Sequence, residues 1–264
     1  MFKYPRTPHI AGSRFQLGDH DLEAVKWTEL VGKYLIIEEK MDGANTGISF
    51  TQNGDLQLQS RGHYLRGGPR EKQFDLLKQW ATTHQETFFS VLGSRYVMYG
   101  EWMFAKHTYF YDDLPHYFLE FDILDTQNNV FLSTKARRQL LFEGPVVVPI
   151  TQVAVLHQGI VLSMIQLQNF LKRSGFITHQ RFDNLVDVAL MSGQVPADVM
   201  RHSDLNDKME GLYIKWEDEQ HVLGRYKFVR DTFLSNISNQ DQHWHDRPII
   251  QNQLRTGCFE KMFM

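Results

Sequence analysis

The chain has 264 residues, 42% of them hydrophobic and 22% charged, which is enough apolar material for one large domain or two small ones. Its net charge of -3 excludes a globally basic surface of the kind that many nucleic-acid-binding proteins carry, so any phosphate-binding surface must be local. The single cysteine, Cys258, excludes an internal disulfide, and no apolar run reaches the roughly 18 residues of a membrane span, so we expect a cytoplasmic protein that does not enter membranes.

The first half of the chain is predicted to form strands around one helical segment. Lys40 follows the first of these strands directly and precedes a tight turn that ends at Gly43. Helical periodicity covers Glu71–Leu92, with a break near His84. The predicted strands are Tyr34–Glu39, Ala44–Phe50, Asp55–Ser60, Arg95–Trp102 and Tyr117–Leu124.

The second half of the chain mixes the two kinds of element. Helices are predicted over Thr134–Phe142, Val161–Arg173 and Arg181–Met191, and strands over Val146–Val155, Glu210–Trp216 and His221–Phe228. Strands with interspersed helices and several hairpins predict a mixed, largely antiparallel α+β fold. We expect one domain over residues 1–240 and a short C-terminal tail over residues 241–264.

Lys40 is the candidate nucleophile. It lies where the end of a strand would hold its side chain and the glycine turn would leave room for a ligand. A lysine amine attacks only when it is deprotonated, and partial burial or a neighbouring cation lowers its pKa toward neutrality. A Lys-x-Asp-Gly tetrapeptide is more often a surface β-turn, so this fragment needs support from elsewhere in the chain.

Five further segments give that support. The fragment around Lys40 is Glu38–Asn45. The five further segments are Ser60–Gly62, Tyr99–Trp102, Phe121–Ile123, Met209–Lys215 and Arg225–Lys227. Together they resemble, in order, motif I, the motif that follows it, and motifs III, IIIa, IV and V of the covalent nucleotidyltransferase superfamily, which contains ATP-dependent DNA and RNA ligases and mRNA capping enzymes. Chance agreement of six ordered motifs is a poor explanation. The chain therefore resembles an ATP-dependent RNA ligase of the duplex-sealing type, and the resemblance implies a nucleotidyltransferase domain of antiparallel sheets with flanking helices.

The resemblance also implies a role for each site residue. Lys40 would take AMP from ATP, and Lys227 and Arg225 would neutralise charge on the α-phosphate. Glu210 would hold a Mg²⁺ or Mn²⁺ ion, mostly through water. Taken singly, each residue also fits a structural role, such as an exposed basic strand, a salt-bridged glutamate or a core ring. The other implied nucleotide-binding residues are Glu39, Asn45, Arg61, Glu101 on the ribose and Phe121 stacked on the purine.

The nucleic-acid substrate is indicated by fewer residues. Arg66 and Arg70 are predicted to follow a nucleic-acid backbone. Asn45 is a feature of ligases that seal nicked duplex RNA, whereas Asp42 replaces the histidine common in that subgroup and matches DNA ligases. The 37 residues after Lys227 are too few for the OB-fold that DNA ligases and capping enzymes carry there, so we expect no OB-fold domain.

The predicted function is ATP-dependent RNA ligation with ATP and Mg²⁺ or Mn²⁺ as cofactors. AMP would pass from Lys40 to a 5′-phosphate end, and a 3′-hydroxyl would then seal that end and release AMP. A DNA ligase would share every motif, a capping guanylyltransferase would use GTP, and a non-catalytic nucleic-acid-binding protein is a third alternative. Because sealing needs healed ends, a kinase or phosphatase that heals RNA ends is an expected partner in RNA repair.

Overall fold

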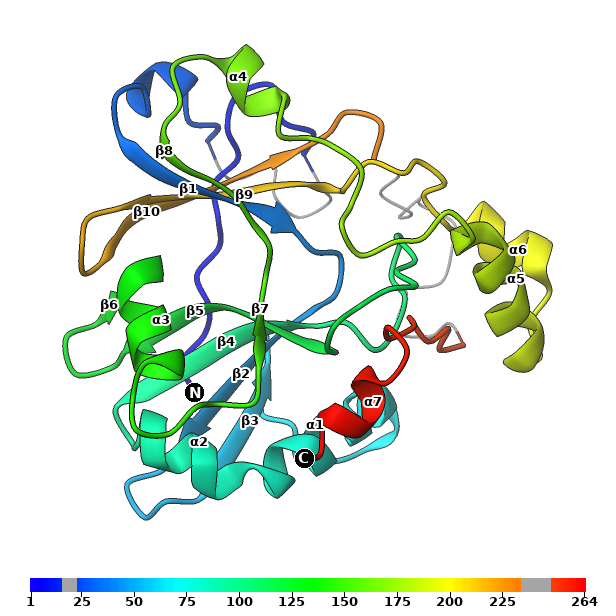
Figure 1. Cartoon of the computed structure of the whole chain (residues 1–264), viewed down its shortest axis with the longest axis horizontal. Coiled ribbons are helices and arrows are strands. Elements are labelled where there is room, and N and C mark those ends of the chain that lie inside the picture. The colour runs from blue at the N-terminus through cyan, green and yellow to red at the C-terminus, as the bar shows by residue number, and fades with distance from the viewer. Residues whose placement is uncertain (16–22, 234–247) are drawn as a thin grey trace.

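Two β-sheets form the frame of the molecule. The computed structural model describes residues 1–15, 23–233 and 248–264, apart from the side chain of Arg70. Figure 1 shows a four-stranded sheet as the upper layer, in the order β10-β9-β1-β8, above a larger sheet in the order β3-β2-β4-β5-β6. Pairing is antiparallel throughout except for β7, which runs parallel to β5. The predicted α+β class is therefore confirmed.

The elements have the following bounds. The upper sheet contains β1 (Tyr34–Lys40), β8 (Val155–Ile160), β9 (Gly211–Glu217) and β10 (Val222–Val229). The lower sheet contains β2 (Ala44–Phe50), β3 (Leu56–Ser60), β4 (Tyr96–Trp102), β5 (Phe118–Asp125), β6 (Val130–Phe131) and β7 (Thr151–Gln152). The helices are η1 (Trp27–Glu29), η2 (Pro69–Phe74), α1 (Asp75–Thr83), α2 (Gln85–Leu92), α3 (Thr134–Phe142), α4 (Met164–Gln168), α5 (Arg181–Met191), α6 (Pro196–Arg201) and α7 (Cys258–Lys261). No helix of the described ranges is long and apolar enough to cross a membrane.

Alternation along β1 gives the upper sheet two different faces. Leu35 and Ile37 are fully buried in a hydrophobic core with residues of β9, β10 and η1. Glu38 and Lys40 have the opposite parity and therefore face the lower sheet. The same holds for β9 and β10, because Lys215 is paired in register with both Ile36 and Arg225. The charged face of the upper sheet is thus turned toward the lower sheet.

The lower sheet packs its other face against α1 and α2. Trp80 and Phe88 from these helices are fully buried in the larger hydrophobic core, together with Ile48 of β2. The helical segment breaks at His84, as the sequence predicts, and the His84 ring bonds the Met262 carbonyl at 2.6 Å. This core anchors the sheet that carries motifs III and IIIa.

Two predicted elements differ from the structure. The strand expected over Val146–Val155 is replaced by β7 and by β8, which begins at the last of these residues. Proline at position 149 lacks an N–H, so a continuous central strand could not run through it. The helix expected over Val161–Arg173 is reduced to α4, because Ser163 caps a helix that begins at Met164 and Ile165 stays exposed, leaving no sustained buried stripe.

Both ends of the chain pack against the sheets. Residues 248–264 lie beside the loops that follow β4, with Met262 1% exposed in the larger core. Residues 241–247 of the expected tail lie outside the described part, and the boundary at residue 240 stays a prediction. Residues 2–10, which we call the N-terminal strap, run from β10 to the lower sheet (Figure 1). His9 pairs with Lys227, and the carbonyl of Phe2 accepts hydrogen bonds from Gln59 and Tyr99.

Candidate active site

Lys40 and Glu210 form the centre of the site. Lys40 is the last residue of β1 and pairs in register with Gly211, so motif I and motif IV meet at one strand end. Lys40 Nζ lies 2.5 Å from Glu210 Oε1; the Lys40 side chain is 20% exposed and the Glu210 side chain is fully buried. A Cβ at position 211 would collide with the carbonyl oxygen of Phe228, so glycine is required for β9 and β10 to approach there.

The turn after Lys40 is fixed by Asp42 and Gly43. The Asp42 carboxylate accepts hydrogen bonds from the backbone N–H groups of Thr108 and Tyr109, both at 2.7 Å. A Cβ at position 43 would lie 2.6 Å from the Met103 sulfur, so only glycine fits. Asp42 therefore ties motif I to the loop after β4, which gives this aspartate a structural role beside the one suggested by its match to DNA ligases.

Acidic groups surround the Lys40 amine. Glu101 of β4 pairs in register with Asn45 of β2, so both lie on the same face of the lower sheet, and the N–H of Gly43 donates to the Glu101 carboxylate. Burial raises the pKa of Glu101 to about 8 and that of Glu210 to about 7. Burial would lower the pKa of Lys40, but its pairing with Glu210 raises it instead. The amine is thus held as an ammonium ion, whereas the sequence led us to expect a lowered pKa.

Lys227 and Arg225 lie on the same face of β10 but contact different groups. Lys227 is buried, and its charge lowers the pKa of Glu210, which places it beside the Lys40 centre. Arg225 lies farther along, with Nη1 3.8 Å from Asp122 and its guanidinium 3.7 Å from the centre of the Phe131 ring. The structure thus brings one of the two predicted phosphate-binding cations to Lys40 and the other to Asp122.

Aromatic rings pack between the sheets beside Asp122. The Phe121 ring of β5 lies 6.2 Å from the Tyr213 ring of β9, centroid to centroid, and the two ring planes are inclined at 49°. The Tyr4 hydroxyl of the N-terminal strap donates to Asp122 at 2.5 Å and lies 2.5 Å from the Tyr213 hydroxyl. Sequence reasoning identified Phe121 alone among these rings. Tyr213 could have been found because it alternates with Gly211 on the predicted strand, whereas Tyr4 carries no such signal.

A second set of charges lies deeper between the sheets, and we call it the inter-sheet charge cluster. Its members are Glu38, Glu120, Asp122, Arg137 and Lys215, and their side chains are 0–1% exposed. Lys215 Nζ lies 2.9 Å from Glu38 and 3.2 Å from Asp122, and it also donates to the Phe121 carbonyl. Arg137 of α3 bonds Glu120 at 2.6 Å and Glu38 at 3.3 Å. The cluster joins β1 and β9 of one sheet to β5 of the other.

The remaining predicted residues lie away from the Lys40 amine. Glu39 points to the opposite face of β1, where its carboxyl accepts a 2.5 Å hydrogen bond from Ser174 and burial raises its pKa to about 7. Arg61 and Arg66 are exposed on the segment after β3, whose backbone is held by hydrogen bonds to the Glu71 carboxylate. The side chain of Arg70 lies outside the described residues.

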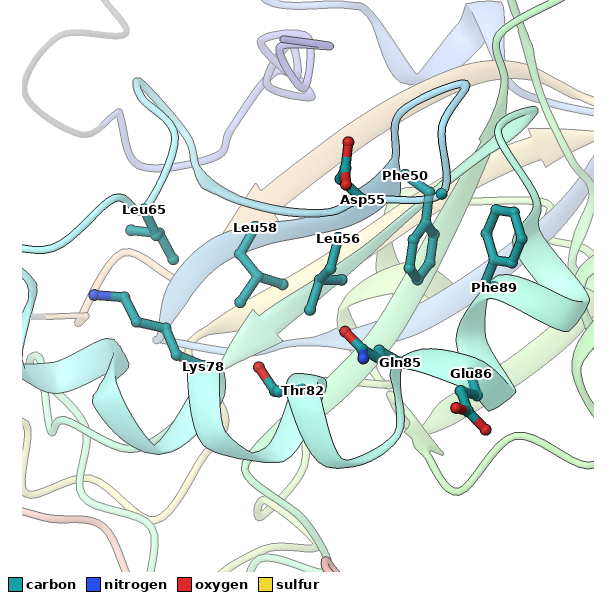
Figure 2. A pocket seen from close by; sticks show the side chains of 11 residues that line it. Phe50, Asp55, Leu56, Leu58, Leu65, Lys78, Thr82, Gln85, Glu86 and Phe89 are labelled. Atoms are coloured by element: carbon teal, nitrogen blue, oxygen red, sulfur yellow. The ribbon is translucent and has the colours of Figure 1, made fainter.

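A pocket of 590 Å³ lies between the β2–β3 hairpin and the helices α1 and α2. Figure 2 shows Phe50, Leu58 and Phe89 along its apolar wall, with Lys78 at one end. Side chains alternate along a strand, so Phe50 and Asn45 point to opposite faces of β2. This pocket therefore lies on the opposite face of the lower sheet from Lys40 and Glu101. None of its lining residues is one of the predicted site residues.

The donor set around Lys40 suits a hard divalent cation. Among the described residues, no group of three or more His, Cys, Asp and Glu side chains is arranged as a ready-made metal cage. Mg²⁺ is typically bound by one or two carboxylates together with water and substrate phosphates, and the Glu210 and Glu101 carboxyls match that pattern. A polyphosphate brought beside these acidic groups would also need positive charge to offset their repulsion.

Comparison with known proteins decides the family. A family model described as RNA ligase matches residues 33–229. The chain belongs to the RNA ligase family. The matched range begins just before β1 and ends with β10, so it contains all six motifs of this family member. No curated protein matches the chain by sequence.

Solved structures of RNA ligases resemble the fold. A Naegleria gruberi RNA ligase variant with AMP and manganese has a TM-score of 0.50 and 14% identity, over 88% of this chain and 63% of that one. A second Naegleria gruberi variant, with ATP and manganese, has a TM-score of 0.50 and 15% identity, over 78% and 52%. An archaeal ATP-dependent RNA ligase has 16% identity and a TM-score of 0.49, over 87% and 48%. This family member spans about half the length of several of these ligases.

Proposed function

We propose that this chain is an ATP-dependent RNA ligase that carries AMP on Lys40. The observation that carries the proposal is the meeting of three motifs at one amine. Lys40 from motif I lies 2.5 Å from Glu210 of motif IV, and the charge of Glu101 from motif III acts on the same amine. Membership of the RNA ligase family supports this assignment.

In the first step the Lys40 nitrogen attacks the α-phosphorus of ATP. A P–N bond forms, the bond from the α-phosphorus to the bridging oxygen breaks, and pyrophosphate leaves with the electron pair. Lys40 must first lose its proton, and Glu210 is the adjacent base at 2.5 Å with a pKa raised to about 7. Lys227 offsets the charge that grows on the α-phosphate. Phe121 stacks on the base with Tyr213 beside it, and Glu101 and Asn45 hold the ribose.

Two further transfers complete the reaction. An oxygen of a 5′-phosphate end attacks the phosphorus of lysyl-AMP, so the P–N bond breaks and Lys40 recovers its proton. A 3′-hydroxyl then attacks the 5′-phosphorus, forming the phosphodiester bond and expelling AMP. A divalent cation held by Glu210 would supply further positive charge at the phosphates. Arg61, Arg66 and Arg70 lie on one segment after β3 and are proposed to contact the phosphate backbone of the nucleic acid.

The decisive experiment measures covalent labelling. The chain is incubated with α-labelled ATP or α-labelled GTP and with Mg²⁺ or Mn²⁺, and it is then analysed by denaturing electrophoresis. We expect acid-labile label from ATP that is absent in Lys40→Ala and present in the matched surface variant Lys135→Ala, whose side chain is 59% exposed. Label from GTP would instead support a capping guanylyltransferase, and wild-type protein that never becomes labelled would refute the proposal.

The strand that is sealed is tested separately. Sealing rates are compared on nicked duplexes made of RNA, of DNA and of RNA–DNA hybrid, each with 5′-phosphate and 3′-hydroxyl ends. We expect the fastest sealing on nicked RNA, and faster sealing on all-DNA duplexes would identify a DNA ligase. We also propose an end-healing kinase or phosphatase as partner. Joining of 5′-hydroxyl ends by this chain alone would refute the need for that partner.

A further inference from the structure

The backbone before Glu210 and the backbone after it are held in different ways. On the C-terminal side, Gly211 begins β9 and pairs with both Lys40 and Val229. On the N-terminal side, residues 203–209 form no helix and no regular strand. A fully buried carboxylate 2.5 Å from the lysine amine needs a fixed backbone on both sides, because a small shift of a reacting group is costly in rate. The N–H of Met209 donates to the carbonyl of Lys172 at 3.0 Å, so the remaining support must reach the carbonyls of Met209 and Glu210.

Arg230 provides that support. Its side chain is 3% exposed, and its Nε donates to the carbonyl of Met209 at 2.9 Å. Its backbone N–H donates to the carbonyl of Glu210 itself at 3.1 Å. Nη2 donates to the Asp204 carboxylate at 2.7 Å, and Nη1 donates to the Thr232 hydroxyl at 2.8 Å. One buried guanidinium therefore holds the residue before Glu210, while the backbone of the same arginine holds Glu210.

Asp204, which orients the guanidinium, is itself fixed. Its backbone N–H donates to the carbonyl of Thr108 at 2.9 Å, and its own carbonyl accepts a hydrogen bond from Arg181 of α5 at 2.9 Å. The N–H of Thr108 in turn donates to Asp42, two residues after Lys40. The contacts form a closed path that runs from Lys40 through Asp42, Thr108, Asp204, Arg230 and Glu210 back to Lys40.

We propose that Arg230, oriented by Asp204, is a positioning residue that holds Glu210 against Lys40 during lysine adenylylation. The inference rests on the proposed function. Arg230 contacts Glu210 through the backbone and touches none of the groups assigned to the nucleotide. Its contribution is therefore to the geometry of the Lys40–Glu210 pair and not to ATP binding.

Two conservative variants test the inference. Arg230→Lys keeps the charge but has a single nitrogen in place of the planar fork, so it cannot hold Met209 and Asp204 together. We expect the rate of lysyl-AMP formation at saturating ATP to fall about 30-fold, with the KM for ATP changed less than about threefold. Asp204→Asn keeps the side-chain shape and is expected to lose about 10-fold in the same rate. Arg255→Lys, at an exposed pair with Asp113, is the control and should lose none.

A double variant separates positioning from general structural support. If Arg230 acts through Glu210, then Arg230→Lys made in a Glu210→Gln background should cost less than about threefold, because the group that it positions is gone. An equal loss in both backgrounds would overturn the inference, and so would an Arg230→Lys enzyme within about threefold of the wild-type rate. Thermal unfolding verifies that each variant is folded, and Asp204→Asn provides the test if Arg230→Lys is not. Wild-type protein that forms no lysyl-AMP would refute the proposed function itself, which is a different result.

Discussion

Two groups of buried charge lie between the sheets, and they differ in how their acidic side chains are paired with cations. In the inter-sheet charge cluster, each acid lies within about 3.3 Å of a cation, and the side chains are 0–1% exposed. Around Lys40, the carboxyls of Glu101 and Glu210 have pKa values raised to about 8 and about 7, and the lysine is 20% exposed. The first group is closed to solvent, whereas in the second the Lys40 side chain reaches solvent and burial raises the pKa of both carboxyls.

The difference shows how a structural ion pair can be distinguished from a reacting one when both lie between the same two sheets. Both groups use lysines from adjacent strands, Lys40 on β1 and Lys215 on β9. Lys215 is surrounded by Glu38, Asp122 and the carbonyl of Phe121, which leaves no room for a substrate. Lys40 has one close carboxylate and an exposed side, so a phosphate can reach it. The two roles are therefore distinguished by the exposure of the lysine and by the pKa values of the carboxyls around it, and not by residue type.

Replacing each lysine with methionine tests whether Lys40 has a reacting role and Lys215 a structural one. Lys40→Met should abolish lysyl-AMP formation while lowering the free energy of unfolding by only about 1–2 kcal/mol, because Glu210 can take up a proton near pH 7. Lys215→Met should cost about 3–5 kcal/mol, because the buried carboxylates of Glu38 and Asp122 each lose their nearest cation. Urea unfolding at pH 7 measures both values. A Lys215→Met variant no less stable than Lys40→Met would contradict the distinction.

The pair Glu38 and Glu39 sharpens the comparison on a single strand. Glu38 has two cations in the inter-sheet charge cluster, whereas Glu39 on the opposite face bonds Ser174 and has its pKa raised from 4.5 to about 7 by burial. A raised pKa favours the neutral form in the folded state. This contribution to stability is therefore complete below pH 4.5 and is lost as the pH rises through about 7.

Glu39→Gln should remove that dependence on pH. We expect the variant to match the wild type within about 1 kcal/mol at pH 5 and to exceed its free energy of unfolding by about 3 kcal/mol at pH 8. Urea unfolding at the two pH values measures the difference. Glu86→Gln, at an exposed position on α2, is the matched control and should show no change with pH. A constant offset for Glu39→Gln would show that Glu39 is ionised throughout.

Much of the fold follows from local pattern. The strands on either side of Lys40, the break at His84 and the final hairpin end within one or two residues of their predicted bounds, because apolar runs and turn residues mark them. Successive side chains of a strand point to opposite faces, so the predicted strand already places Glu39 and Lys40 on different faces. The resemblance, in contrast, implies that both bind the nucleotide. The approach of motifs I, III and IV to one amine was expected from the resemblance and not from periodicity.

The rest depends on contacts between distant parts of the chain. Arg230 and Asp204 show no motif or period, and their importance appears only when residues 203–210 are seen to lack a strand. Lys215 was identified as part of a motif, but its burial depends on Glu38 and Asp122, which other strands supply. Tyr4 meets Asp122 across 118 residues of sequence, and no local pattern predicts such a contact.

Tyr4 lies at the edge of the inter-sheet charge cluster, beside the proposed base site, and gives the last and smallest test. Its hydroxyl bonds Asp122 of the inter-sheet charge cluster and the Tyr213 hydroxyl beside the proposed base site, and its ring lies 5.3 Å from that of Phe121. Tyr4→Phe keeps the ring and removes both hydrogen bonds. We expect a loss of about 1–2 kcal/mol in the free energy of unfolding, because the buried Asp122 and Tyr213 each lose a partner.

The effect on nucleotide binding separates the two neighbours of Tyr4. If its hydroxyl orients Tyr213 for the base, the KM for ATP in lysyl-AMP formation should rise about threefold to tenfold at an unchanged maximal rate. Tyr34→Phe, at an exposed position where β1 begins, is the matched control and should change neither stability nor KM. If Tyr4→Phe loses stability but keeps its KM for ATP, the N-terminal strap stabilises the inter-sheet charge cluster and does not affect nucleotide binding. The boundary between structural and reacting charge would then lie between Asp122 and Tyr213.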